Sequence, residues 1–310
     1  MKRIYITGIA GLLGGNAGYL LKNKYSIAGV DIININMDNV QTESFDMLDE
    51  KLLKQSLKRF KPDVVIHTVA AINVDKCEED IQYAKKLNVI LTQTVTNTCN
   101  ELGIKLIYIS TDAVFDGEKV ELYDELDLTN PVNVYGSTKL EGEQIVLKNK
   151  SNLVLRTNIY GFNIQNKNSF GEWILYSLIE NKTINMFDDI NFTPILVNEL
   201  ANILGMAIEK DLSGLYNACG TNSISKYDFA VLIKDTFAIK SGVINKTISD
   251  TFPFKAKRSK NMGMSNLKLR NELNLKISTP KESIVLFKEL YDNGYVKNLK
   301  EFVRSGENEN

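Results

Sequence analysis

Short runs of apolar residues alternate along the first half of the chain with longer stretches of helical periodicity. Such runs are typical of strands in a parallel sheet, which helices bury on both faces. The alternation therefore predicts an α/β fold built on a doubly wound parallel sheet. The predicted strands cover residues 4–7, 26–31, 63–67, 105–110 and 152–156, and helices are expected near 49–60, 80–102 and 135–148.

From about residue 162 onward, aromatic and asparagine-rich segments replace this pattern. We expect this region to form a smaller C-terminal α/β part, with an irregular basic stretch over 252–264 and a disordered tail over 305–310. Its predicted helices lie near 170–181, 198–210 and 226–237, and its predicted strands near 184–187, 193–197 and 214–220.

The first predicted strand leads directly into Gly8, Gly11 and Gly14. In a Rossmann-type turn the first glycine allows the tight turn, the second lets backbone approach a pyrophosphate, and the third lets the next helix pack closely. That helix begins at Leu12 and Leu13, where unpaired N–H groups and the helix dipole attract an anion. We therefore expect a bound dinucleotide; a glycine turn that serves packing alone is the alternative.

Asp31 ends the second predicted strand about 20 residues beyond the glycines. A carboxylate there can bind both ribose hydroxyls of an adenosine and would repel a 2′-phosphate. NADH is therefore the expected cofactor, with NADPH as the alternative.

The composition of the chain argues against several other classes of protein. The chain has 310 residues, 44% hydrophobic and 24% charged, and its net charge of −1 argues against nucleic acid as a partner. No apolar run reaches the roughly 18 residues that cross a bilayer, and no signal peptide is present, so we expect a cytoplasmic protein. Cys77, Cys99 and Cys219 lack metal spacing, and His67 is the only histidine, so neither a metal site nor a Ser-His-Asp relay is expected.

Polar residues follow the fourth predicted strand, where ligands bind in open parallel sheets. Ser110 and Thr111 end that strand, and Tyr135 and Lys139 lie four residues apart on the next predicted helix, hence on one helix face. These residues and the glycine turn occur in the order needed to surround a nicotinamide.

Longer motifs surround these positions: residues 110–117 read STDAVFDG and residues 130–143 read NPVNVYGSTKLEGE. Segments 155–157, 160–161, 193–194, 214–220 and 257–261 extend the same pattern. With these motifs the chain resembles the extended short-chain dehydrogenases/reductases and, among them, the dTDP-4-dehydrorhamnose reductase family. The resemblance covers nearly the whole chain.

The resemblance implies NAD(P)H-dependent reduction of the 4-keto group of a nucleotide-diphosphate 4-keto-6-deoxy sugar. Tyr135 would then protonate the carbonyl oxygen. Because a phenol has a pKa of about 10, we expect Lys139 to stabilise its phenolate while also binding the nicotinamide ribose. Thr111, together with Ser110, would hydrogen-bond the carbonyl oxygen; a strand-end cap is the alternative role for Thr111.

Three further positions match functional positions of the superfamily. The resemblance implies that Asp46 meets the adenine amino group, Ala70 lines the cofactor, and Arg258 binds the substrate phosphates. A helix N-cap, simple packing and a solvated basic stretch are the respective alternatives. The resemblance also implies a dinucleotide-binding domain over residues 1–165, to which 195–220 returns, and a substrate-binding part formed by 166–194 and 221–310.

The chain departs from the family pattern around the sugar. The family has Tyr where this chain has Ala113, Trp where it has Asn158, and a longer tyrosine-containing segment in place of 71–75. The identity of the sugar therefore stays open.

Two other functions stay open as well. One is an NAD-retaining nucleotide-sugar epimerase or dehydratase, although dehydration uses Asp-Glu after the threonine and here Asp112 is followed by Ala113. The other is a non-catalytic dinucleotide-binding subunit that resembles the regulatory subunit of methionine adenosyltransferase. A homodimer is a further arrangement that the sequence leaves open.

Overall fold

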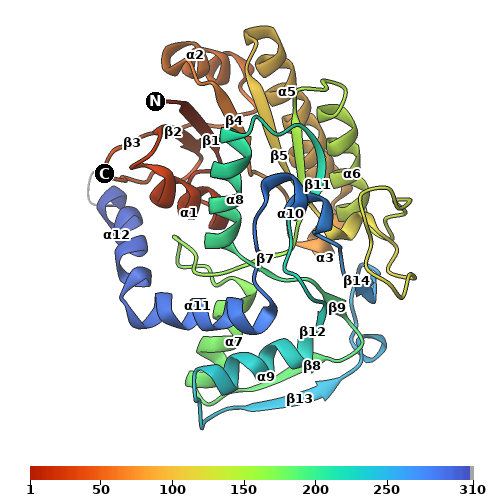
Figure 1. The fold of residues 1–310 in the computed structure, drawn as a ribbon. Coiled ribbons are helices and arrows are strands. Elements are labelled where there is room, and N and C mark those ends of the chain that lie inside the picture. Colours follow the sequence, from red (N-terminus) through yellow and green to blue (C-terminus); the bar gives the residue numbers. More distant parts are fainter. Residues whose placement is uncertain (308–310) are drawn as a thin grey trace.

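A seven-stranded parallel sheet forms the centre of the larger part of the molecule (Figure 1). The computed structural model describes residues 1–307, of which 303–307 are described by their backbone alone. The strand order is β11-β6-β5-β4-β1-β2-β3, so the order reverses between β1 and β4, where ligands bind in such sheets. The strands are β1 (Arg3–Thr7), β2 (Ser26–Asp31), β3 (Val40–Ser44), β4 (Val64–His67), β5 (Lys105–Thr111), β6 (Leu153–Thr157) and β11 (Gly214–Asn217).

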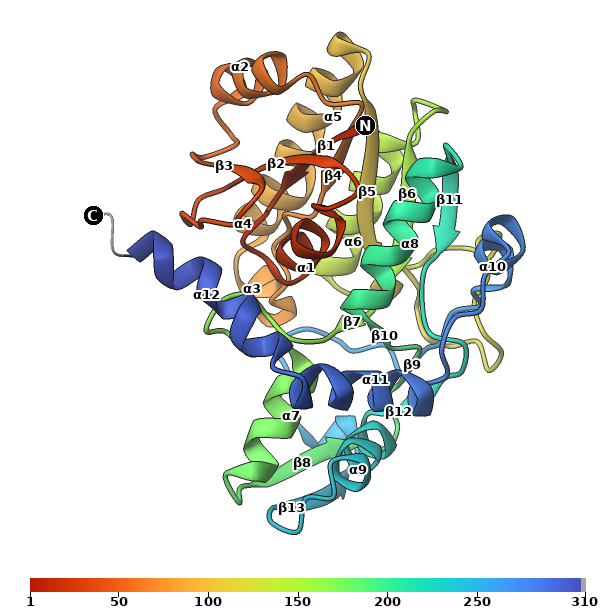
Figure 2. The ribbon, with the colours of Figure 1, turned by 60° about the vertical axis from the view of Figure 1, so that its left-hand side comes forward.

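Helices cover both faces of this sheet (Figure 2). Since neighbouring residues of a strand point to opposite faces, Ile4 and Ile6 of β1 pack in one core and Tyr5 in the other. Helices α1 (Leu12–Leu21) and α8 (Val197–Glu209) pack on the Ile4 side. Helices α2 (Glu50–Phe60), α5 (Leu91–Leu102) and α6 (Val134–Val146) pack on the Tyr5 side, which confirms the predicted doubly wound sheet.

All five strands predicted in the first half are present, but β3 was not predicted. Its sequence Val-Gln-Thr-Glu-Ser is mostly polar because it forms the exposed edge of the sheet. The helix expected over 80–102 is interrupted: α3 (Val74–Glu79) and α4 (Ile81–Lys85) precede a π-helical turn (Lys86–Ile90), and only then does α5 begin.

A smaller group of elements lies at the end of the molecule away from α2 in both views (Figures 1 and 2). Its strands pair in small sheets, β13 with β8 in parallel and β12-β9-β14 in that order, while β10 pairs with β7. These elements are β7 (Ile159–Tyr160), α7 (Phe170–Ile179), β8 (Thr183–Phe187), β9 (Asn191–Phe192), β10 (Ile195–Leu196), β12 (Ile224–Ser225), α9 (Lys226–Thr236), β13 (Val243–Thr247) and β14 (Asn261–Met262).

Several boundaries in this second half differ from the predictions. β13 was not predicted, and the expected strand over 193–197 shortens to β10, since residue 194 is a proline that cannot donate to a ladder. The strand expected over 214–220 ends at Asn217, and the irregular stretch over 252–264 contains β14.

Helices complete the C-terminal end: α10 (Leu267–Leu273), α11 (Pro280–Asp292) and α12 (Tyr295–Glu307). The disorder predicted from residue 305 is therefore wrong for 305–307, and 308–310 lie outside the described residues. No helix within residues 1–307 has the length and apolar character needed to cross a membrane. The three cysteines are free and buried, as expected for packing residues.

Candidate active site

The glycine turn after β1 is packed so closely that side chains at Gly8 and Gly14 would clash with it. Gly8 has φ +78°, and a Cβ there would lie 2.6 Å from Thr68 Oγ1. A Cβ at Gly14 would lie 2.0 Å from the Gly8 carbonyl oxygen, so α1 packs against the turn through that glycine. Gly11 is the N-cap of α1 and provides no side-chain cap. The residues therefore fit the predicted pyrophosphate site, where the first N–H groups of α1, at Leu12 and Leu13, stay available to an anion.

Asp31 lies beside this turn at the end of β2. Its Oδ2 accepts a hydrogen bond from the Ala10 N–H at 3.0 Å, and its Oδ1 accepts one from the Ile32 N–H at 2.8 Å. Burial raises the pKa of Asp31, although these backbone hydrogen bonds oppose that rise. The carboxylate is thus held beside the glycine turn, where an adenosine ribose would lie.

Asp46 and Ala70 are two further residues predicted to bind the cofactor. Asp46 is exposed, and its Oδ1 accepts from the Leu48 N–H at 3.0 Å. Asp49, not Asp46, is the N-cap of α2, so the helix-cap alternative for Asp46 is wrong. Ala70 is half-buried in the segment after β4.

Thr111 ends β5 and is 5% exposed. Its hydroxyl donates to Asp112 Oδ1 at 3.0 Å and accepts from the Ala113 N–H at 3.2 Å. Thr111 therefore caps the short 3₁₀ turn that follows β5, and the same hydroxyl also lies close enough to lower the pKa of Tyr135.

Tyr135 and Lys139 project from the first turns of α6. Burial raises the pKa of Tyr135 to about 12, with the Thr111 hydroxyl opposing the rise. The Lys139 ammonium donates to the Ile109 carbonyl at 2.7 Å and lies 4.1 Å from the centre of the Tyr108 ring. Burial lowers the pKa of Lys139 to about 7, opposed by Glu143. Burial is therefore the main cause of the raised pKa of Tyr135, and stabilisation of its phenolate by Lys139 stays a prediction.

Ser110 faces a different environment from Thr111. Its hydroxyl donates to Glu143 Oε1 at 2.5 Å, and Glu143 forms a buried ion pair with Arg156 at 2.8 Å. Because the single hydroxyl proton of Ser110 is used inside this cluster, the structure does not support the predicted substrate contact. Successive strand residues point to opposite faces, which explains why Ser110 contacts Glu143 and Thr111 contacts Asp112 instead.

Arg258 lines a cavity of about 390 Å³ beside Gly117 and Phe254. Its guanidinium pairs with Asp75 at 2.9 Å and stacks 4.5 Å from the centre of the Phe254 ring. One guanidinium nitrogen, Nη1, is buried without a hydrogen-bond partner, so Arg258 keeps a donor for a phosphate oxygen.

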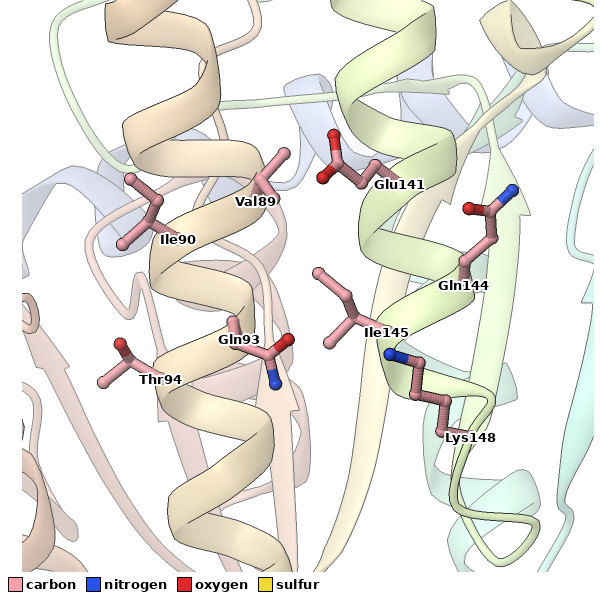
Figure 3. A pocket seen from close by; sticks show the side chains of 8 residues that line it. All are labelled: Val89, Ile90, Gln93, Thr94, Glu141, Gln144, Ile145 and Lys148. Carbon is pink, nitrogen blue, oxygen red and sulfur yellow. The ribbon is translucent and has the colours of Figure 1, made fainter.

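A second groove, of about 460 Å³, lies between α5 and α6, and side chains from both helices point into it (Figure 3). No predicted site residue lines this groove, so it is separate from the site described above.

Asp112, which accepts from Thr111, and Lys226 had no role assigned from the sequence. Asp112 is buried and accepts from Asn158 Nδ2 at 2.5 Å, and Lys226, from the start of α9, interacts electrostatically with it. Lys226 follows Asp112 by more than a hundred residues, and no motif links them, so only the fold reveals their proximity.

The chain has a doubly wound sheet, a glycine turn after the first strand, and a Tyr–Lys pair on the helix after β5. This is the architecture of the extended short-chain dehydrogenases/reductases, and the chain belongs to that class of proteins. Within that class, the family described as RmlD substrate binding domain matches residues 1–292. Since the match covers nearly the whole chain, the chain belongs to that family, as the sequence motifs predicted.

The relatives of this chain are named as two different kinds of protein. Methionine adenosyltransferase 2 subunit beta of Xenopus tropicalis is 31% identical over 250 residues, 77% of this chain and 73% of the relative. dTDP-4-dehydrorhamnose reductase of Salmonella typhimurium is 27% identical over 276 residues, 84% of this chain and 90% of the relative. A solved dTDP-4-dehydrorhamnose reductase of Bacillus anthracis, in complex with NADP, superimposes with a TM-score of 0.83 at 27% identity, covering 93% of this chain and 99% of the other.

Proposed function

We propose that this chain is an NAD(P)H-dependent oxidoreductase that reduces the 4-keto group of a nucleotide-diphosphate 4-keto-6-deoxy sugar. The observation that carries the proposal is the convergence of Thr111, Tyr135 and Lys139 at the end of β5, in a chain of the same family as the named reductases.

In this proposal the nicotinamide dinucleotide, when bound, supplies hydride to the carbonyl carbon. Gly8, Gly11 and Gly14 keep the turn free of side chains, and the N–H groups at the start of α1 bind the pyrophosphate. Asp31 accepts hydrogen bonds from the ribose and thereby favours NADH over NADPH. We further propose that Asp46 binds the adenine edge and Ala70 lines the cofactor.

Tyr135 is the proton donor to the carbonyl oxygen. With its pKa raised to about 12, the phenol stays protonated at neutral pH and can donate. Thr111 fixes the phenol, since its hydroxyl lies beside it, and Lys139 in its protonated form stabilises the phenolate left after proton transfer. The hydroxyl proton of Thr111 points to Asp112, which leaves Tyr135 as the donor to the substrate.

Two parts of the chain divide this work. We propose that residues 1–165, with 195–220, bind the dinucleotide, and that 166–194 and 221–310 bind the sugar nucleotide. The pairing of β11 with β6 supports the return of the chain to the first part, and the free Nη1 of Arg258 supports phosphate binding by the second. The cytoplasmic location and the homodimer stay predictions.

The test is consumption of NADH and of NADPH, followed by nicotinamide absorbance, with a panel of 4-keto nucleotide sugars that differ in base and in ring stereochemistry. The proposal expects turnover with at least one dTDP-linked 4-keto-6-deoxy sugar. No consumption with any member of the panel, by protein that binds NADH, would contradict it.

A subunit role is the second candidate, because relatives named methionine adenosyltransferase 2 subunit beta reach 31% identity. Retention of Thr111, Tyr135 and Lys139 favours the reductase. Stable copurification with a methionine adenosyltransferase, in protein that shows no reductase turnover, would favour the subunit role instead. The epimerase or dehydratase alternative is weaker, since Ala113 follows Asp112.

A further inference from the structure

The segment 162–165, which follows β7, packs against the first turns of α1. The Phe162 carbonyl accepts a hydrogen bond from Asn16 Nδ2 at 2.9 Å. Ile164 is 1% exposed, and a Cβ at Gly15 would lie 2.9 Å from the Ile164 Cγ2 atom. The glycine at position 15 therefore allows this segment to lie directly against the helix that begins at the glycine turn.

The buried carboxylate of Glu172, in α7, closes the loop that contains this segment. Glu172 Oε2 accepts from the Asn163 N–H at 3.0 Å and from the Ser169 N–H at 2.9 Å. Asn163 Oδ1 in turn accepts from the Gln165 backbone N–H at 3.1 Å. The backbone that carries the Gln165 side chain is therefore held in place from both sides of the loop.

The Gln165 side chain reaches the glycine turn. Its Nε2 donates to the Ala10 carbonyl oxygen at 2.7 Å, across 155 residues of sequence. The amide nitrogen is the atom that faces Ala10, because a carbonyl oxygen can only accept. The same peptide bond is held at its other end, where the Gly11 N–H donates to the Gly8 carbonyl at 2.9 Å.

Ala10 also orients one oxygen of Asp31. The Ile32 and Ile33 N–H groups donate to Asp31 Oδ1, at 2.8 and 3.3 Å, whereas the Ala10 N–H donates to Oδ2 at 3.0 Å. The hydrogen bonds of Gln165 and Asp31 therefore act on the same residue. Without the Gln165 amide, the buried Ala10 carbonyl loses a hydrogen-bond donor, so Ala10 is freer to rotate and to shift the N–H that holds the carboxylate.

We propose that Gln165 is a positioning residue for cofactor selection, which holds Ala10 and, through Ala10, orients the Asp31 carboxylate toward the adenosine ribose. This inference rests on the proposed function, in which Asp31 binds the ribose and favours NADH over NADPH. It does not require Gln165 to touch the cofactor. A hydrogen bond that served stability alone would not distinguish the two cofactors.

The experiment measures the affinities of the full-length chain for NADH and for NADPH by fluorescence titration. Gln165→Met keeps the length of the side chain but has no donor for the Ala10 carbonyl. We expect the Kd for NADH to rise about three- to tenfold, the usual effect of losing one hydrogen bond between uncharged groups. The Kd for NADPH should change little, because a ribose that carries a 2′-phosphate does not use Asp31.

A double-mutant cycle tests whether the effect passes through Asp31. In the Asp31→Ala background, Gln165→Met should cause no further loss of the preference for NADH, because the carboxylate that it orients is absent. Equal effects of Gln165→Met in the two backgrounds would contradict the proposed coupling.

Two further variants control for the fold of the loop. Asn166→Met replaces an exposed amide at the next position and should leave both affinities unchanged. Gln165→Ala removes the same donor together with most of the side chain, so it should lower the preference for NADH as Gln165→Met does. Urea unfolding of each variant identifies any that does not fold, and either of the two Gln165 variants is sufficient for the test.

The outcomes separate this inference from the proposed function. If Asp31→Ala lowers the preference for NADH but neither Gln165 variant does, Gln165 has no positioning role, and the ribose site stands. The same conclusion follows if a Gln165 variant weakens the binding of NADH and NADPH by equal factors. If Asp31→Ala itself leaves the preference unchanged, the proposed role of Asp31 fails, and the role of Gln165 fails with it.

Discussion

Replacing Gly14 by alanine tests whether the glycine turn is shaped for a pyrophosphate. The added Cβ would lie 2.0 Å from the Gly8 carbonyl oxygen and 2.8 Å from the Gly8 carbonyl carbon, both backbone atoms that cannot rotate away. To reach an ordinary contact, the start of α1 must move from the turn by about 1 Å or more. That shift displaces the N–H groups of Leu12 and Leu13 from the anion.

The size of the effect follows from two opposing terms. Overpacking costs about 1–3 kcal/mol, and alanine in place of a helical glycine returns about 1 kcal/mol. Because the clash involves backbone, we expect a net loss of about 1–2 kcal/mol in the free energy of unfolding. Loss of one charge-assisted hydrogen bond to the pyrophosphate, about 1.5–3 kcal/mol, should weaken NADH binding about ten- to a hundredfold.

Urea unfolding and fluorescence titration with NADH measure the two effects separately. Gly205→Ala in α8 is the matched control, because its Cβ would meet the end of the Leu21 side chain at 3.2 Å and would lie in ordinary contact with Tyr25, at 3.7 Å. It should leave NADH binding unchanged. If Gly14→Ala binds NADH as tightly as the wild type and unfolds at the same urea concentration, the role assigned to this glycine is wrong.

Two further predictions concern charge. Asp31→Ala should lower the preference for NADH over NADPH, measured as the ratio of their kcat/KM values. The substitution removes the carboxylate that accepts from the ribose and that repels a 2′-phosphate. An unchanged ratio would exclude ribose binding by Asp31. The free energy of unfolding should rise between about pH 7 and pH 10. Burial lowers the pKa of Lys139 and Lys226 to about 7, so in this pH range the unfolded chain binds protons that the folded chain does not. Lys139→Met should flatten part of that rise in urea unfolding at several pH values, and a variant profile parallel to the wild type would contradict the assignment.

Local features of the fold could be predicted from the sequence. The strand before Gly8, the three glycines and the acid of Asp31 lie within one βαβ unit, so their spacing alone fixes their arrangement. The strand β3 escaped prediction because an exposed edge strand has no apolar run to detect.

The candidate site was less accessible to sequence reasoning. The order along the chain placed Ser110 and Thr111 together, but the alternation of side chains along β5 turns Ser110 toward Glu143 and away from Thr111. Lys226 and Asp112 interact electrostatically although more than a hundred residues separate them, and no motif indicates that interaction. Likewise, the pKa of Tyr135 is set chiefly by burial, which residue spacing does not report.

The most direct test of the central claim is the turnover of Tyr135→Phe with a dTDP-4-keto-6-deoxy sugar and NADH. The account predicts a loss of about 10²–10⁴-fold in kcat, the usual contribution of a positioned general acid, with NADH affinity unchanged because the phenyl ring keeps its place on α6. Wild-type turnover by this variant would show that the proton comes from another group, and the assignment of Tyr135 would be wrong.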